Sequence, residues 1–173
     1  ILVVQIDTAS GVVNDIPAVR RALDAARHPA LLFVDTVASL GCMPCEMDEW
    51  GIDAAYSGSQ KCLSCTPGLS PVSFSAAAVE RIKARKTPCP SWFQDLSLVL
   101  GYWSGAKRTY HHTAPVNPLF GLHESLVMLA EEGLENAWLR HRNNHLRLRA
   151  GLEAMGLKFV VREDARLPQL NTV

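Results

Sequence analysis

The chain has 173 residues, of which 48% are hydrophobic and 20% are charged, which is typical of one globular domain with its own core. Lys plus Arg and Asp plus Glu number 17 each, so the net charge is zero and favours neither a nucleic acid nor an anionic membrane as partner. No apolar run approaches the roughly 20 residues of a membrane span. We therefore expect neither a nucleic acid nor a membrane as partner.

Short apolar runs and amphipathic stretches alternate along the first part of the chain. Asp15 and Pro17 are typical of a helix start, because Asp caps free backbone N–H groups and Pro fits the first turn. Ser75 offers a similar cap further on. The predicted elements are, in order, a strand at 1–6, a helix at 18–27, strands at 30–34, 52–56 and 72–74, and a helix at 76–86.

The remainder of the chain is predicted to be mainly helical. Leucines recur at spacings of three and four between positions 119 and 129, as on one face of a helix. Gly133 is expected to bend or interrupt this helix, and Gly156 to cap its end. The predicted elements are a helix at 93–103, a loop at 105–115, a long helical pattern over 116–155 and a strand at 157–161.

This alternation of strands and helices predicts an α/β fold. The strands read as continuous apolar runs, which indicates a mostly parallel sheet with helices layered on it. In such sheets the functional groups gather beyond the carboxyl ends of the strands. Two residues are expected there: Asp35 after the strand at 30–34, and Lys61 after the strand at 52–56.

Four of the five cysteines form two C-x2-C pairs with sixteen residues between them, a spacing that lies within the range of zinc ribbons. A structural zinc site, a redox-active dithiol and four small half-buried side chains are the alternatives. The apolar framework around them needs no metal to fold, and Pro44 removes an amide donor that could bind a thiolate. We therefore favour incidental cysteines and predict no metal site. The four cysteines are Cys42, Cys45, Cys62 and Cys65.

The odd cysteine count and the length of the chain favour a reducing compartment, because a core of this size does not depend on disulfides. We expect the cytoplasm, with a peroxisome or mitochondrion as the alternative for a eukaryotic protein. The chain begins on an apolar run without Met, and it stops at Val173 as another β-favouring run begins. We therefore expect it to be an interior piece of a longer protein.

Lys61 is the candidate catalytic residue. It follows a buried strand and the small polar run at 57–60, where desolvation would favour the neutral, nucleophilic amine used in Schiff-base chemistry. Pyridoxal phosphate is the cofactor that reacts with such a lysine, and its ring nitrogen needs an acidic partner. Asp35 fits this role, because a buried carboxylate needs a cation nearby. The alternative is that Lys61 is an ordinary surface lysine.

Short motifs spread along the chain form a recognisable set. They are VDTVASLG at 34–41, WGID at 50–53, YSGSQK at 56–61, PG at 67–68, RKT at 85–87, YHHT at 110–113, AEEGLEN at 130–136 and RLP at 166–168. Together they resemble the class V aminotransferases of the pyridoxal-phosphate type I fold. The later motifs narrow the resemblance to the alanine–glyoxylate and serine–glyoxylate aminotransferases, and it covers essentially the whole chain.

The resemblance implies an architecture and a reaction. The expected fold is a three-layer α/β sandwich with a mostly parallel sheet, followed by the start of an α+β small domain. Residues 1–132 would belong to the large cofactor-binding domain, and residues 133–173 to the connecting helix and the small domain. The implied reaction is pyridoxal-phosphate-dependent transfer of an amino group from alanine or serine to glyoxylate. A different transaminase or a lyase on the same scaffold, or a CxxC zinc-binding module, is the alternative.

The resemblance also implies the site residues. Lys61 would form the Schiff base with the cofactor and carry protons at the substrate α-carbon, and Asp35 would pair with the pyridine nitrogen. Thr8 would lie beside the cofactor, and Gln60 would help to hold its phosphate. Because family members are homodimers with shared active sites, Tyr110 and Thr113 would reach the phosphate of the partner subunit's cofactor. The residues expected to bind the cofactor are thus Thr8, Asp35, Gln60, Lys61, Tyr110 and Thr113.

Two histidine pairs remain. His111 and His112 are adjacent, and adjacent side chains rarely converge on one ion. His141 and His145 share a helix face at the i, i+4 spacing that can bind a metal, but no carboxylate lies at a matched spacing. We expect surface or interface roles for the second pair, and no metal at either.

Overall fold

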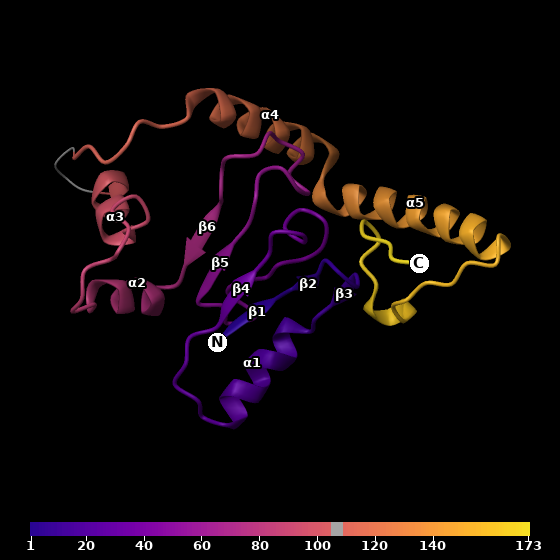
Figure 1. Cartoon of the computed structure of the whole chain (residues 1–173), viewed down its shortest axis with the longest axis horizontal. Helices are drawn as coiled ribbons and strands as arrows, with labels where there is room; N and C mark the ends of the chain where they lie inside the picture. The colour runs from indigo at the N-terminus through magenta and orange to yellow at the C-terminus, as the bar shows by residue number, and fades with distance from the viewer. Residues whose placement is uncertain (105–108) are drawn as a thin grey trace.

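The structure is a computed structural model that describes residues 1–104 and 109–173. A four-stranded sheet forms its centre (Figure 1), in the order β1 (Leu2–Val4), β4 (Phe33–Asp35), β5 (Ala54–Tyr56) and β6 (Val72–Phe74). β4 pairs in parallel with both β1 and β5, whereas β6 runs antiparallel to β5. The predicted α/β class with a mostly parallel sheet is confirmed, and the carboxyl ends of β1, β4 and β5 share one edge.

The predicted strand at 1–6 is divided between two sheets. β1 ends at Val4, and β2 (Ile6–Asp7) pairs antiparallel with β3 (Val12–Val13) in a separate hairpin. The intervening Gln5 is buried: its N–H donates to the Asp35 carbonyl oxygen (2.9 Å), and its side-chain oxygen accepts from the Ser39 hydroxyl (2.6 Å). These bonds hold Gln5 at the sheet edge, and the chain leaves the sheet after it.

α1 (Ile16–Ala25) begins where the sequence predicts, because the Asp15 side chain accepts a hydrogen bond from the Ala18 N–H (2.9 Å). Its apolar face completes the main core, which lies between the helix and the sheet. Burial of this cluster removes apolar surface from water and is the main stabilising term of the fold. Its buried members are Ile16, Leu23, Leu32, Val34, Ile52 and Ala55.

Four α-helices follow β6 within the described residues. They are α2 (Ala76–Lys83), α3 (Leu96–Ser104), α4 (Val116–Glu132) and α5 (Leu134–Ala154). Ser75 caps α2 as predicted, accepting from the Ala78 N–H. Gly133, with φ of 82°, separates α4 from α5, and Gly156 follows α5 with the same φ, a conformation that favours glycine. Both glycine predictions are therefore confirmed. Residues 105–108 of the predicted loop 105–115 lie outside the described residues.

The predicted strand at 157–161 is wrong. The Val160 N–H donates to the Thr172 carbonyl oxygen (3.0 Å), but no described strand pairs with this segment. The short 3₁₀ helix η1 (Glu163–Ala165) follows instead. An apolar run forms a strand only when a neighbouring strand supplies the hydrogen bonds of a ladder.

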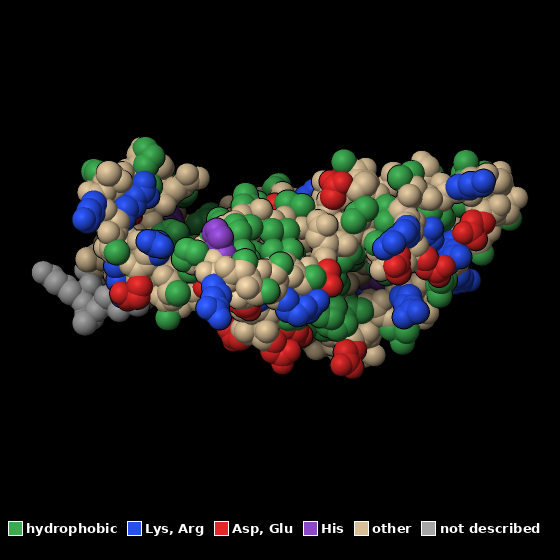
Figure 2. Space-filling model, turned by 90° about the horizontal axis from the view of Figure 1, so that it is seen from below, with side chains coloured by type: hydrophobic (Ala, Val, Ile, Leu, Met, Phe, Trp, Pro, Cys, Tyr) green, Lys and Arg blue, Asp and Glu red, His purple; other side chains and the backbone are tan. Residues whose placement is uncertain are grey.

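Large hydrophobic side chains remain exposed on β1, on β4 and on α4. Figure 2 shows hydrophobic side chains across the middle of the face seen from below, with charged side chains spread around them. The exposed residues on β1, β4 and α4 include Leu2, Val4, Phe33, Val116, Leu119, Phe120, Leu126 and Met128. Extended apolar surface of this kind marks contact with other protein segments or subunits. Within the described residues, none of the helices combines the length and hydropathy that crossing a bilayer requires.

Asp53 connects three elements at the start of β5, and its replacement tests this arrangement. Its carboxylate accepts from the Leu32 N–H (2.9 Å) and from the Ser75 hydroxyl (3.0 Å). Since one hydrogen bond to a charged group contributes about 1.5–3 kcal/mol, we expect Asp53→Ala to lower the free energy of unfolding in urea by about 2 kcal/mol. Asp48→Ala, at an exposed carboxylate, is the control. Equal losses in the two variants would contradict this role.

Candidate active site

Asp35 lies at the shared carboxyl edge of the parallel strands. It is in register with Tyr56 on β5. Its Oδ1 accepts from the Val37 N–H (2.8 Å), and its Oδ2 accepts from the Tyr56 hydroxyl (2.5 Å). The carboxylate is half-buried, yet among the described residues no Lys, Arg or His forms an ion pair with it. Such a group can accept a cation from a bound molecule.

Tyr56 is a site residue that the sequence reasoning missed. The hydrogen bond to Asp35 is the main reason why the pKa of the Tyr56 hydroxyl is raised, with smaller contributions from burial and from the nearby negative charge. Tyr56 therefore stays protonated and keeps one carboxylate oxygen of Asp35 in place. Asp35 and Tyr56 each stand at the carboxyl end of one of two neighbouring parallel strands. This matching position was the sequence signal that could have identified the pair.

Lys61 lies on a turn that follows β5 beyond the same edge. The turn is closed by backbone bonds from the Lys61 N–H to the Gly58 carbonyl oxygen (3.4 Å) and from the Ser64 N–H to the Lys61 carbonyl oxygen (2.9 Å). The side chain is exposed, so the predicted desolvation of Lys61 is not found. The reason is that the turn projects beyond the sheet, where the described residues leave the amine open to solvent.

Buried serines hold the Lys61 turn in place, and the sequence analysis gave them no role. The Ser57 hydroxyl donates to the Thr36 carbonyl oxygen (3.1 Å), which joins the turn to the segment that follows Asp35. The Ser59 hydroxyl donates to the Thr66 carbonyl oxygen (2.6 Å), across the turn. Both side chains are almost fully buried. The alternation of small hydroxyl residues around Lys61 is the only sequence signal for this scaffold.

Thr8 and Gln60 also lie beyond carboxyl ends of parallel strands, and both are exposed. Thr8 lies in the turn of the β2–β3 hairpin, which follows β1. Gln60 precedes Lys61, and its Oε1 lies 2.8 Å from the position that a Cβ on Gly58 would occupy. A side chain at residue 58 would therefore require the exposed end of the Gln60 side chain to move.

Tyr110 and Thr113 lie on the connection between α3 and α4. Their hydroxyl groups are 2.7 Å apart, and the Tyr110 side chain is 74% exposed. The aromatic contact of Tyr110 is with Tyr102, at a centroid distance of 6.4 Å. Within the described residues, neither hydroxyl contacts Asp35 or Lys61, so one copy of the chain does not bring all the predicted residues together.

The cysteines do not form a cluster, and the two C-x2-C pairs are split in space. Cys42 forms a disulfide with Cys62, Cys45 packs against the main core, and the Cys65 Sγ lies 3.8 Å from the Pro118 carbonyl oxygen. Among the residues described, no three His, Cys, Asp or Glu side chains could share a metal ion. The interpretation of Cys42 and Cys62 as incidental is wrong, because folding brings them together although 20 positions separate them.

The histidines make local contacts. The Nδ1 atoms of His111 and His112 lie 2.8 Å apart, and His111 Nε2 contacts the Trp92 carbonyl oxygen at 3.1 Å. His145 Nδ1 contacts Asn171 Oδ1 at 2.6 Å and is buried. The pKa of His141 is lowered, mainly by burial and secondly by Arg140. The expected surface role is therefore wrong for His145, whereas His141 is half-buried.

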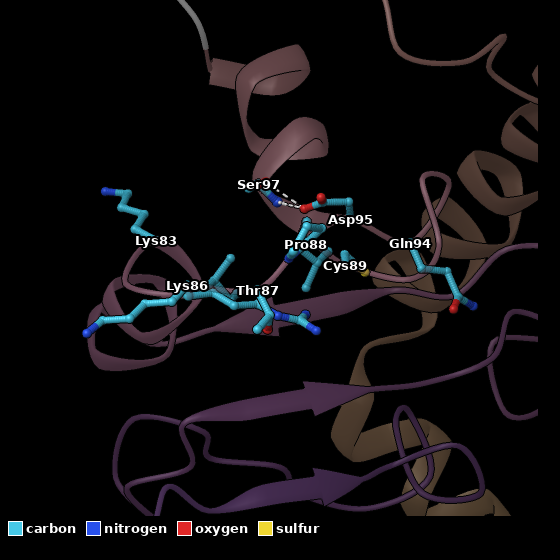
Figure 3. A pocket seen from close by; sticks show the side chains of 11 residues that line it. Lys83, Lys86, Thr87, Pro88, Cys89, Gln94, Asp95 and Ser97 are labelled. Carbon is cyan, nitrogen blue, oxygen red and sulfur yellow. Dashed lines mark hydrogen bonds between the residues drawn. The ribbon is translucent and has the colours of Figure 1, made fainter.

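A cavity of about 330 Å³ lies between α2, α3 and their connection (Figure 3). Figure 3 shows the Lys83 and Lys86 side chains extending away from it, whereas Asp95 bonds to Ser97 at the start of α3. None of the predicted site residues is among the described residues that line this cavity. The candidate site is therefore the sheet edge with Asp35 and Lys61.

Comparison with known proteins agrees with this geometry. The family model "Aminotransferase class-V" matches residues 1–173. The chain belongs to the class V aminotransferases. It is 48% identical over 150 residues to alanine–glyoxylate aminotransferase of Oryctolagus cuniculus, covering 85% of this chain and 38% of that protein. It is 46% identical over 153 residues to L-aspartate–glyoxylate aminotransferase of Paracoccus denitrificans, covering 88% of this chain and 38% of that protein.

The fold of this class V aminotransferase chain also matches solved relatives. The crystal structure of alanine–glyoxylate aminotransferase from Nostoc sp. superposes with a TM-score of 0.90 at 42% identity, over 96% of this chain and 44% of the other. The chain therefore spans less than half the length of the relatives it matches. The predicted family is confirmed. Its cofactor is pyridoxal phosphate, and the half-buried Asp35 carboxylate, with no cation from the described chain, fits the protonated ring nitrogen.

The Tyr56–Asp35 hydrogen bond predicts an unusual tyrosine titration. The pKa of Tyr56 is raised in the folded protein. The hydrogen bond therefore stabilises the folded state fully below about pH 10, the ordinary pKa of tyrosine. This stabilisation is lost as the pH rises through the pKa of Tyr56 in the folded protein. The difference between the ultraviolet titration curves of the wild type and of Tyr56→Phe isolates the ionisation of Tyr56. Asp35→Asn should lower the pH at the midpoint of this ionisation. Tyr110→Phe is the control, and an Asp35→Asn midpoint equal to that of wild type would contradict the coupling.

Proposed function

We propose that this chain carries part of an aminotransferase that transfers an amino group from alanine or serine to glyoxylate. The observation that carries the proposal is the placement of Asp35 at the carboxyl end of β4 and of Lys61 beyond the carboxyl end of the adjacent parallel strand β5. The names of the rabbit and Paracoccus relatives share glyoxylate, which supports it as the acceptor.

Lys61 and Asp35 have different roles in this reaction. Bound pyridoxal phosphate withdraws electrons from the substrate α-carbon, which makes its proton removable. Lys61 would supply the amine that holds the cofactor, and its free amine would take the α-proton and return it. Asp35, held by Tyr56 and the Val37 N–H, would keep the ring nitrogen protonated. The exposed position of Lys61 leaves its amine free to meet both molecules.

The remaining predicted residues would complete the cofactor site. Thr8 would lie beside the cofactor, and Gln60 would contact its phosphate. Tyr110 and Thr113 would reach the phosphate in the partner subunit of a homodimer. Their exposure and their mutual bond support this arrangement, as does the apolar surface on α4. We also propose that residues 1–132 belong to the large domain and residues 133–173 to the connection and the small domain, of a protein that acts in the cytoplasm.

A third candidate amino donor, L-aspartate, is supported by a specific observation. The Paracoccus denitrificans relative, named for L-aspartate, is nearly as similar to this chain as the rabbit relative named for alanine. Activity of the full-length protein with glyoxylate should therefore be measured with alanine, serine and L-aspartate. The donor with the highest kcat/KM identifies the physiological class, and no turnover with any of the three would contradict these donors.

Replacement of Lys61 tests the catalytic assignment. General acid–base groups contribute about 10²–10⁴-fold to rate, so Lys61→Ala should lower kcat by at least this factor. Borohydride reduction followed by peptide mass spectrometry should place the phosphopyridoxyl group on Lys61 in the wild type. Lys86→Ala, at an exposed lysine outside the site, should retain activity. A phosphopyridoxyl group on a different lysine would overturn the assignment.

Mixing of subunits tests the shared site. Lys61→Ala and a Tyr110→Phe/Thr113→Ala double variant should each be impaired as homodimers. A heterodimer of the two contains one site with intact Lys61 and with intact Tyr110 and Thr113 from the partner. Refolding the two variants together should therefore restore activity in about half of the dimers, each with one intact site, if subunits associate at random. Activity no higher than the average of the separate homodimers would contradict sharing.

A further inference from the structure

Cys42 and Cys62 lie side by side at the base of the Lys61 turn. Their Cα atoms are 5.9 Å apart, within the range that a disulfide spans without backbone movement. They are the first members of the two C-x2-C pairs. The second members, Cys45 and Cys65, remain free and face different parts of the molecule. The structure thus selects a pairing between the two motifs rather than within either of them.

Cys62 anchors the turn that carries Lys61. It follows Lys61 directly, and its side chain packs in the second core cluster with Ile6, Cys42 and Leu167. The Cys65 N–H donates to the Ser59 carbonyl oxygen (3.0 Å), so the backbone around Cys62 is held from both sides. A covalent bond at Cys62 therefore restrains the residue next to the candidate catalytic lysine.

Cys42 is fixed to the C-terminal part of the chain. Its carbonyl oxygen accepts from the Gln169 side-chain amide (2.8 Å), and the Gly41 carbonyl oxygen accepts from the Trp138 indole N–H (3.1 Å). Cys42 itself is 6% exposed. A Cys42–Cys62 bond consequently ties the Lys61 turn to a position that α5 and the 166–170 segment already hold.

The structure also offers a hydrogen-bond acceptor to the reduced form of the pair. Cys62 Sγ lies 3.3 Å from the Ala38 carbonyl oxygen, which can accept a hydrogen bond from the thiol. Cys62 is half-buried, whereas Cys42 is shielded, so Cys62 is the more accessible of the two residues. Both redox states are thus accommodated by the same backbone, and Cys62 is the reactive member.

We propose that Cys42 and Cys62 are a reversible dithiol–disulfide pair that locks the Lys61 turn when oxidised. The oxidant is a low-molecular-weight disulfide, RSSR. The Cys62 thiolate attacks one sulfur of RSSR and releases one RSH, and the Cys42 thiolate then displaces the second RSH from Cys62. The two protein thiols lose two electrons and two protons, which reduce RSSR to two RSH. An excess of RSH reverses both steps.

Thiol mapping of the full-length protein tests the pairing. After treatment with glutathione disulfide, alkylation should label three of the five cysteines of this chain, namely Cys45, Cys65 and Cys89, and a Cys42–Cys62 linked peptide should appear. After incubation with excess reduced glutathione, all five should be labelled and the linked peptide should be lost. A Cys42–Cys45 or Cys62–Cys65 bond, no bond, or a bond that resists reduced glutathione would each overturn the proposal.

Hydrogen exchange tests the lock. The amides of residues 61–65 should exchange more slowly in the oxidised protein than in the reduced protein, because the disulfide opposes opening of the turn. The difference should be lost in Cys62→Ser and retained in Cys45→Ser, which removes the other cysteine of the first pair. Exchange that is independent of redox state in a wild type with the mapped disulfide would overturn the lock. Neither readout needs substrate or cofactor, so both are independent of the proposed reaction.

Discussion

The parallel pairing of β4 with both β1 and β5 is the constraint on which the site depends. Parallel neighbours must end at the same edge of the sheet, so residues that follow different strands come together there. The register places Asp35 opposite Tyr56 and fixes where the Lys61 turn begins. A shift of one residue in this register would move Asp35 to the opposite face of the sheet, and the Tyr56 hydrogen bond would be lost.

The sequence predicts this edge well, because the relevant signals are local. The apolar runs before Asp35 and Lys61 identify two buried strands, and Ser75 and Gly133 mark helix boundaries through capping and through a positive φ. The strand predicted at 157–161 fails because its conformation depends on a partner that periodicity does not reveal. The exposure of Lys61 is missed for the same reason: burial is decided by what covers a residue rather than by its neighbours in sequence.

The cysteines show how a spacing rule can mislead. Two C-x2-C pairs suggest that both members of each pair act together, as in a zinc ribbon. In the fold each pair is divided, because Cys45 enters the main core while Cys42 turns toward Cys62 in the second cluster. The distribution of side chains between two hydrophobic clusters, rather than the spacing, determines which sulfurs meet.

The hydrogen bond between Trp138 and Gly41 connects α5 to the support of the site. α4 and α5 meet at Gly133, and Trp138 lies just over one helical turn beyond this junction. The bond attaches this part of α5 to the loop after β4, directly beside Cys42. A helix that supplies none of the predicted site residues is thereby joined to the base of the Lys61 turn.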